Sequence, residues 1–229
     1  MRGLSHDLKN PLGAIDGHAA LLEEGVKGEL TAEQRASVAR IRRSVRSLLA
    51  LVSDLLEMSK AEAGQLGVQA READVVEVVR DAVEEHRAAA ETAGHRLRLE
   101  VADRRPVVHT DPDRVRQVLG NLLSNAVKYT PPGGQIVVRV DERAGNGRLA
   151  AARYAVIDVV DSGPGIPEDK REEIFEEFAR LQPDEKPGAG LGLTIARRIA
   201  RLLGGDISVA SRNGEGSAFT LWLPLERRH

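Results

Sequence analysis

Two amide side chains and one ammonium group share one face of a predicted helix. Asn121, Asn125 and Lys128 are separated by four and three residues, which places them on the same side of a helix. Amide oxygens are hard ligands suited to Mg²⁺, and a lysine neutralises phosphate charge as a point cation. The face therefore predicts a site for a hydrated divalent cation and a polyphosphate. An ordinary solvated helix face has the same composition, so this pattern alone leaves both interpretations open.

A second candidate cluster directly follows an apolar strand predicted over residues 153–161. The carboxylate of Asp161, at the end of this strand, could accept a hydrogen bond from an amino group such as the exocyclic amine of adenine. Gly163 and Gly165 would let the backbone approach a flat ligand closely, because glycine has no side chain. A plain Asp/Gly turn is the alternative interpretation.

Three glycines, Gly188, Gly190 and Gly192, lead into a helix predicted over residues 191–203. A glycine-rich helix N-terminus presents free N–H groups and a positive dipole end, which suits phosphates. The run is not a dinucleotide-binding fingerprint, because that motif follows a strand and residues 182–187 do not form one. Alone, the glycine run is a weak indication of a phosphate site.

The segment before these glycines could move over a ligand. Phe175 and Phe178 belong either to the core or to an anchor for residues 179–189, which would then act as a lid. Arg180 and Lys186 lie in or beside this loop and could reach a terminal phosphate. Solvated surface charges are an equally good interpretation of these two residues.

The other cluster of reactive groups lies near the N-terminus, on a helix predicted over residues 4–24. His6 has polar neighbours and lies off the apolar stripe of this helix, so it should face water. Ser5, His6 and Asp7 are contiguous and therefore cannot form a hydrolytic triad. Asp7 can still hydrogen-bond the imidazole and fix its tautomer, which leaves the other ring nitrogen nucleophilic.

Two helices with narrow apolar seams form the N-terminal part. Thr31 and Gln34 have the spacing of a capping box and predict the start of the second helix. Two helices joined by a short loop cannot bury two such stripes alone, which favours a homodimer with a four-helix bundle. The seam of the second helix consists of Val38, Ile41, Val45, Leu48, Val52 and Leu55.

The remainder of the chain predicts a mixed fold. Residues 64–72 form the expected domain boundary, giving domains 1–66 and 67–229. After a helix over 74–93, strands are expected over 95–101, 135–141 and 153–161, and a terminal hairpin over 206–211 and 218–223. The helix with the amides starts at Asp111, a good N-cap, and Pro112, which suits the first helical position. Strands mixed with helices, some joined by hairpins, indicate an α+β two-layer sandwich.

Composition excludes several classes of function. The 229 residues carry a net charge of −2, and the six aromatic residues offer few stacking platforms, so we expect no nucleic-acid partner. There are no cysteines, which excludes thiol nucleophiles and disulfides. No apolar run approaches the roughly 20 residues of a membrane span, so no membrane contact is expected from this segment.

In order, these clusters make the chain resemble the catalytic core of a two-component sensor histidine kinase. The ATP-binding part resembles the GHKL (Bergerat) fold. Each motif is modest by itself, but five in the expected order on the expected elements are very specific. The motifs are residues 5–12 (the H box), 121–130 (the N box), 161–167 (the G1 box), 174–178 (the F box) and 188–193 (the G2 box).

The resemblance implies ATP and Mg²⁺ as cofactors and gives each residue a role. His6 would be the phosphoacceptor, Asp7 the acidic partner that polarises it, and Asn10 the residue that positions water during phosphatase action. Asn125 would bind Mg²⁺, Tyr129 would pack on adenine, and Asp161 would bind the adenine amino group. Asn121 and Lys128 would lie near the phosphates. The other expected nucleotide-binding residues are Gly163, Gly165, Ile166, Arg180, Lys186, Gly188, Gly190, Leu191, Gly192 and Leu193.

The expected function is ATP-dependent autophosphorylation of His6, followed by transfer to an Asp of a response-regulator receiver domain. A module that only docks a receiver domain or removes its phosphate is the main alternative. An ATP-driven dimer clamp is a third, which the H box disfavours. Only five residues precede His6, so we expect an excised core or a protein without an input domain. The segment should lie in the cytoplasm, whether the full-length protein is free or membrane-anchored.

Overall fold

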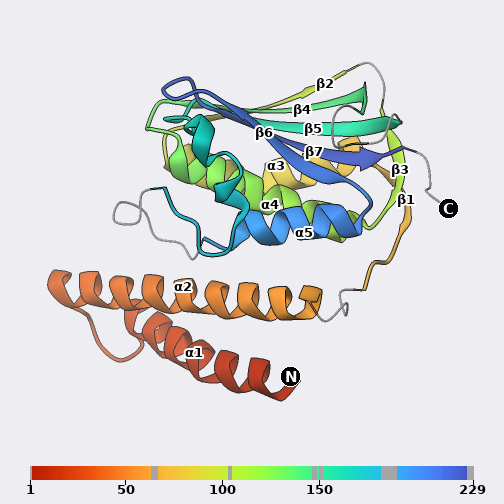
Figure 1. The fold of residues 1–229 in the computed structure, drawn as a ribbon. Coiled ribbons are helices and arrows are strands. Elements are labelled where there is room, and N and C mark those ends of the chain that lie inside the picture. Colours follow the sequence, from red (N-terminus) through yellow and green to blue (C-terminus); the bar gives the residue numbers. More distant parts are fainter. Residues whose placement is uncertain are drawn as a thin grey trace. The chain divides into compact units, whose positions relative to one another are not determined.

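The computed structural model describes residues 2–62, 67–102, 105–145, 149, 152–181 and 190–225, and the side chains of 2–8, 57–58 and 61–62 lie outside this part. The described chain forms two compact units, a helical one that ends before Gly67 and an α/β one that begins there. Figure 1 shows a helical hairpin and a sheet layered on three helices, which confirms the predicted fold class.

The helical unit is an antiparallel hairpin of α1 (Arg2–Glu23) and α2 (Ala32–Glu62). Gly25, in the left-handed region at a φ of 77°, ends the first helix. The predicted capping box is confirmed: the Gln34 N–H donates to Thr31 Oγ1 at 3.2 Å, and the Thr31 N–H donates to Gln34 Oε1 at 2.9 Å. The loop between the helices is therefore held at both ends.

Arg42 of α2 holds the two helices together. Its guanidinium donates to Asp16 at 3.1 Å and to Glu23, both on α1. Val38 and Val45 are buried within the hairpin, as expected for part of the seam. Three other seam residues, Ile41, Leu48 and Leu55, are about half exposed, at 50%, 47% and 53%. The hairpin thus leaves one apolar face of α2 uncovered.

The α/β unit is built on a five-stranded mixed sheet with the order β2-β4-β5-β7-β6. Its strands are β2 (Arg96–Val101), β4 (Gln135–Ala144), β5 (Arg153–Asp161), β6 (Asp206–Ser211) and β7 (Ser217–Pro224). Among the described strands of this sheet, β2 and β4 pair in parallel, and the other three pairs are antiparallel. All five predicted strand segments are confirmed, with boundaries shifted by up to three residues.

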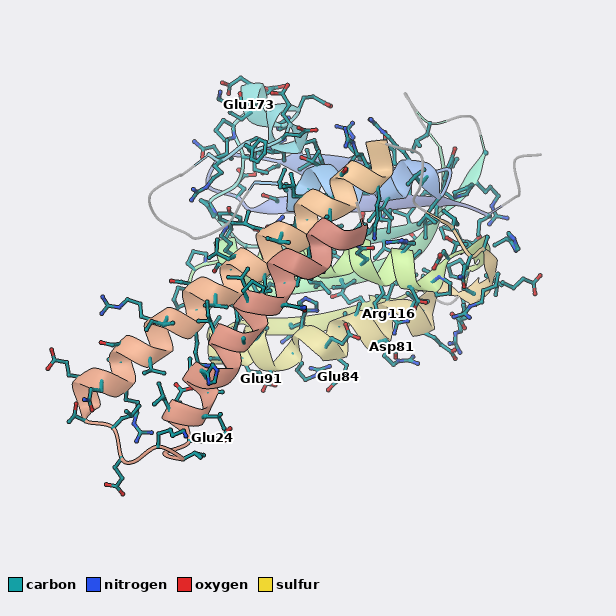
Figure 2. The ribbon with its side chains drawn as sticks, turned by 90° about the horizontal axis from the view of Figure 1, so that it is seen from below. Glu24, Asp81, Glu84, Glu91, Arg116 and Glu173 are labelled. Atoms are coloured by element: carbon teal, nitrogen blue, oxygen red, sulfur yellow. The ribbon has the colours of Figure 1, made fainter. Side chains whose placement is uncertain are left out.

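Three helices cover one face of this sheet (Figure 1): α3 (Val75–Thr92), α4 (Pro112–Tyr129) and α5 (Gly192–Leu202). The apolar face of α4 packs as predicted, with Val115, Val118, Leu119, Leu122 and Leu123 at most 1% exposed. Figure 2 shows the side of α3 that faces away from the sheet, where Asp81, Glu84 and Glu91 point outward. Each helix is therefore amphipathic, with its apolar stripe toward the sheet.

The other face of β5 is also buried, which explains its long apolar run. Tyr154 and Val156 pack there with Trp222 of β7. Asp158 is the one charged side chain in this row, and it accepts hydrogen bonds from Arg143 at 2.5 and 3.2 Å and from Thr220 at 2.8 Å. Its charge is therefore compensated, as burial of a carboxylate requires.

Two short strands were not predicted. β1 (Arg71–Asp74) and β3 (Val107–Thr110) form a separate antiparallel pair. Both have four residues, which is too few for a periodic pattern to be visible in the sequence. Between β5 and α5 the chain makes two 3₁₀ turns, η1 (Glu168–Lys170) and η2 (Glu173–Phe175). Among the described helices, none is long and apolar enough to cross a membrane.

Asp111 links the start of α4 to the segment that leads into β1. Its carboxylate caps α4 by accepting the N–H groups of Asp113 at 3.1 Å and Arg114 at 3.2 Å. Its other oxygen accepts the N–H of Gln69 at 2.8 Å, in the segment that leads into β1. This buried side chain thus satisfies three backbone donors, and it confirms the predicted helix start.

Asp111→Ala should lower the free energy of unfolding by about 2 kcal/mol, the upper range for loss of an N-cap, because three donors lose their acceptor. Urea unfolding followed by circular dichroism measures the change. Asp113→Ala is the matched control: this carboxylate is 78% exposed and forms a surface ion pair with Arg116. It should cost less than about 0.5 kcal/mol. Equal losses in the two variants would contradict the role given to Asp111.

Candidate active site

The ends of three elements meet around the predicted nucleotide-binding residues. The C-terminal end of α4 carries Asn125, Lys128 and Tyr129, all of them half-buried. Asp161 ends β5, and Gly192 begins α5. The fold therefore brings the N box, the G1 box and part of the G2 box to one edge of the sheet.

Asp161 is buried, with 8% of its surface exposed. Its Oδ1 accepts the N–H of Gly163 at 2.8 Å, and the backbone N–H of Ser217 also donates to the carboxylate. Burial raises the pKa of the Asp161 carboxyl above its ordinary value, and the two backbone donors oppose this shift. The protein thus keeps a desolvated carboxylate at the end of β5, where it can accept a hydrogen bond from a ligand.

Gly163 lies where α4 and β5 come together. A Cβ added at this position would be 2.5 Å from Asp161 Oδ1 and 3.2 Å from the Tyr129 carbonyl oxygen. A side chain there would push the G1 loop away from the end of α4. Glycine is thus required here because the backbone approaches other protein atoms closely, whereas the predicted approach to a flat ligand stays a prediction.

The rest of the G1 loop is held by the β6–β7 hairpin. Gly165 has a φ of 74°, and a Cβ there would lie 1.9 Å from the Arg212 carbonyl oxygen. The N–H of Ile166 donates to Ser211 Oγ at 2.8 Å, and Ile166 itself is buried. Gly216, at a φ of 86°, packs against the Asp161 backbone in the same way. The predicted residues Gly163, Gly165 and Ile166 therefore shape one rigid loop.

The N-terminus of α5 lies beside α4. A Cβ on Gly192 would be 3.5 Å from Asn121 Oδ1, so the two predicted residues are neighbours. Within the part of the chain that the structure describes, no side chain caps this helix, and its first turn has no acidic residue. Its first N–H groups and the positive end of its dipole are thus suited to an anion near Asn121. Leu191, immediately before, is buried and anchors the helix, whereas Leu193 is half-buried.

The F box is tied to α5. Thr194 Oγ1 lies 2.9 Å from the Phe175 carbonyl oxygen and 3.0 Å from that of Glu176. The guanidinium of Arg197 stacks on the Phe175 ring at 4.4 Å and bonds Asp206 at 3.1 Å. Phe175 is buried and Phe178 is 61% exposed, so only the first belongs to the core.

The two described ends of the predicted lid touch. Gly190, at a φ of 73°, lies so close to Phe178 and Ala179 that a Cβ there would meet their backbone at 2.7 Å. Arg180 is exposed just beyond this contact. Lys186 and Gly188 lie outside the described residues. Phe178 itself has a φ of 62°, which is uncommon for a residue with a side chain.

The second candidate site lies in the helical unit. The backbone of His6 and Asp7 belongs to α1, but their side chains lie outside the described part. Asn10, one turn later, is exposed.

Three contributors to the nucleotide-binding edge were not predicted from the sequence. Ser217 supplies a backbone donor to Asp161, Ser211 holds the G1 loop, and Thr194 holds the F box. Each acts on a segment distant in the chain, at separations such as the 45 residues between Ile166 and Ser211. Their contacts with Asp161, the G1 loop and the F box could not be read from local sequence patterns.

The chain matches sequence profiles of two families. The profile described as histidine kinase-, DNA gyrase B-, and HSP90-like ATPase matches residues 110–227, more than half of the chain. The His kinase A (phospho-acceptor) domain matches residues 1–64. The first match covers every predicted nucleotide-binding residue, and the second covers His6, Asp7 and Asn10.

Individual proteins agree with these matches. The adaptive-response sensory kinase SasA of Synechococcus sp. (strain JA-3-3Ab) is 35% identical over 226 residues, which cover 98% of this chain and 58% of SasA. The aerobic respiration control sensor protein ArcB of Escherichia coli (strain K12) is 36% identical over 225 residues, 95% of this chain and 27% of ArcB. The chain therefore spans less than two thirds of these relatives.

A solved structure has a similar arrangement over nearly all of this chain. Full-length ShkA in complex with AMPPNP matches with a TM-score of 0.77 and 32% identity, over 97% of this chain and 45% of ShkA. That protein was solved with an ATP analogue.

The buried carboxylate of Asp161 makes a testable contribution to stability. Because its native pKa is raised above the ordinary value of 3.8, the native state holds this proton more tightly than the unfolded chain. The stability it contributes is complete below the unfolded pKa and falls as the pH rises through the native pKa. Asp161→Asn cannot ionise. The free energy of unfolding of this variant, relative to the unsubstituted protein, should therefore rise with pH across this window and then level off.

Urea unfolding without nucleotide, at a series of pH values from about 3 to 8, measures this difference. Glu168→Gln is the matched control, because its carboxylate is 90% exposed and should give a much flatter difference. A difference for Asp161→Asn that does not change with pH would show that the carboxylate is not desolvated.

Proposed function

The chain belongs to the sensor histidine kinases, and on that premise we propose that it is an ATP-dependent protein-histidine autokinase of a two-component system. The observation that carries the proposal is that the G1 loop after Asp161 packs against Tyr129 at the end of α4, while α5 begins beside Asn121 of the same helix. We assign residues 1–66 to dimerisation and phosphoacceptance and residues 67–229 to ATP binding.

In this proposal ATP lies along the edge that the three elements form. The Asp161 carboxylate accepts a hydrogen bond from the adenine amino group, and Tyr129 packs on the base. The Nζ of Lys128 lies 4.6 Å from the centre of the Tyr129 ring. Lys128 would therefore bind the phosphates of a nucleotide whose base packs on Tyr129. The phosphates extend toward Asn121 and the first N–H groups of α5. The glycines and apolar residues of the G1 and G2 boxes, with Arg180 and Lys186, complete this site.

The residues present fit a magnesium ion only if ATP supplies most of its ligands. Among the described residues, no three His, Asp or Glu side chains converge to hold a metal. Asn125 offers one amide oxygen on the same helix face as Asn121, and Mg²⁺ commonly binds few protein ligands together with waters and phosphates. When bound, the ion would neutralise phosphate charge during transfer.

His6 is the nucleophile in this proposal. A nitrogen of the neutral imidazole attacks the γ-phosphorus in line, the new N–P bond forms, and the bond to the β-phosphate oxygen breaks, so that ADP leaves. Asp7 accepts the remaining ring N–H and stabilises the positive charge that develops on the imidazole. The phosphoryl group then passes to a carboxylate oxygen of an Asp on a receiver domain.

Asn10 suits a second activity of the phosphoacceptor helix, the hydrolysis of a phospho-Asp on the receiver domain. It is exposed, four residues after His6, and therefore on the same face of α1. Its amide could orient a water beside a phospho-Asp but cannot deprotonate it, so its contribution would be positioning. A module with only this phosphatase activity is the second candidate function.

His6→Gln should abolish incorporation of phosphate from γ-labelled ATP with Mg²⁺, because the nucleophile is lost, while ATP binding measured by calorimetry survives. The label on the unsubstituted protein should be acid-labile and base-stable, as expected for a phosphoramidate. His18→Gln is the matched control, an exposed histidine on the same helix that should keep the label. Acid-labile phosphate in the His6 variant would refute the assignment, and no labelling of the unsubstituted protein would favour the phosphatase-only module.

We also propose that the exposed face of α2 is covered by a second copy of the chain, forming a four-helix bundle. Sedimentation should then show a species of twice the 24.8 kDa chain mass. Leu48→Glu should dissociate it, because burying an unpaired charge costs several kcal/mol. Ala50→Glu, on the opposite and exposed side of α2, should not. A monomer for the unsubstituted protein at tens of micromolar would contradict the bundle.

A further inference from the structure

The helix that carries the N box ends immediately before two prolines, Pro131 and Pro132. In a regular helix the Val127 carbonyl would accept the N–H of residue 131, but that residue is Pro131, which has none. Thr130 already leaves the helical conformation, with a ψ of 133°. The Val127 carbonyl therefore needs a donor from elsewhere, one residue before Lys128 and two before Tyr129.

His95 provides this donor. Its Nε2 lies 3.0 Å from the Val127 carbonyl oxygen. Since a carbonyl oxygen can only accept, Nε2 must carry the proton. The histidine is buried, with 6% of its surface exposed. A side chain from the turn between α3 and β2 thus closes the last turn of α4.

Backbone bonds on both sides of His95 fix its position. Its own N–H donates to the Ala90 carbonyl at 2.8 Å. The preceding Gly94 accepts from Gly133 at 3.0 Å, and the following Arg96 donates to Gly134 at 3.0 Å. The turn that carries His95 is therefore bound to the turn that follows α4, and the imidazole is held against the helix end.

Burial of this histidine is not favourable in itself. Among the described residues, its Nδ1 has no hydrogen-bond partner. A buried polar atom without a partner costs free energy, so an apolar ring of the same shape would suit the packing better. The Nε2–H bond to α4 is the feature of His95 that such a ring could not replace.

We propose that His95 is a positioning residue for nucleotide binding, which acts by closing the final turn of α4 and so fixing Lys128 and Tyr129. This inference rests on the proposed function, since those two residues are assigned there to the phosphates and the adenine. His95 itself does not touch the nucleotide in this proposal. Its loss should therefore change the affinity for ATP more than the rate of the chemical step.

Two substitutions separate hydrogen bonding from shape. His95→Phe keeps a ring but removes the donor, and the dissociation constant for Mg·ATP should rise about two- to tenfold, the range for loss of one hydrogen bond. The rate of autophosphorylation at saturating ATP should change by less than about twofold, which gives an effect on KM rather than kcat. His95→Gln, whose amide can donate to the same carbonyl, should recover most of the affinity.

Hydrogen exchange provides a readout that does not depend on nucleotide. Amides of residues 126–130 should exchange faster in His95→Phe than in the unsubstituted protein, because the end of α4 is less well fixed. Thr220→Val is the matched control. It removes another buried hydrogen bond, the 2.8 Å bond to Asp158 on the opposite face of the sheet, and should lower the melting temperature without changing ATP affinity.

The possible results distinguish the two proposals. If the unsubstituted protein does not bind ATP, the proposed function is wrong and this inference falls with it. If that protein binds ATP but His95→Phe binds it equally well, only the role of His95 is wrong. An equal loss of affinity in Thr220→Val, or in His95→Gln, would also overturn the inference, because destabilisation or shape would then explain the effect.

Discussion

The candidate nucleotide-binding site at the end of β5 depends on one desolvated carboxylate. Asp161 ends a strand that is buried on both faces, and burial disfavours its charge. Two backbone N–H groups, from Gly163 and Ser217, stabilise the ionised form, and no ion pair of Asp161 is found among the described residues. The carboxylate is therefore kept available as an acceptor, at some cost to the stability of the fold. Such a cost is common at functional sites, where a feature that weakens the fold is retained for the ligand.

This arrangement requires the chain to approach itself very closely. Gly163 contacts the end of α4, Gly165 contacts the β6–β7 hairpin, and Gly216 contacts the backbone of Asp161. In each case the neighbour of an added Cβ would be a backbone atom or the carboxylate itself, neither of which can move aside cheaply. The glycines around the site are therefore explained by contacts within the protein. Their freedom to approach a ligand is not needed to account for them, although it is compatible with ligand binding.

Long amphipathic elements were predictable from the sequence, whereas contacts between distant short segments were not. The helix from Pro112 to Tyr129 has a cap, an apolar stripe and a polar face, and all three are found as predicted. By contrast, β1 and β3 each have four residues and gain their definition from each other. The same limit applies to the site. Asp161 and Asn121 could be selected from local motifs, but the support that Ser211 and Thr194 give depends on tertiary packing.

The two units bury their hydrophobic residues in different ways. In the α/β unit the apolar stripes of three helices and the sheet face each other, so one chain completes its own core. In the helical hairpin, Arg42 and the buried Val38 and Val45 join the helices, yet Ile41 and Leu48 remain about half exposed. Under the proposed function these requirements suit different tasks. ATP binding needs a unit that is complete in each chain, whereas a phosphoacceptor helix can take part of its stability from a second copy, which makes dimerisation a condition for its packing.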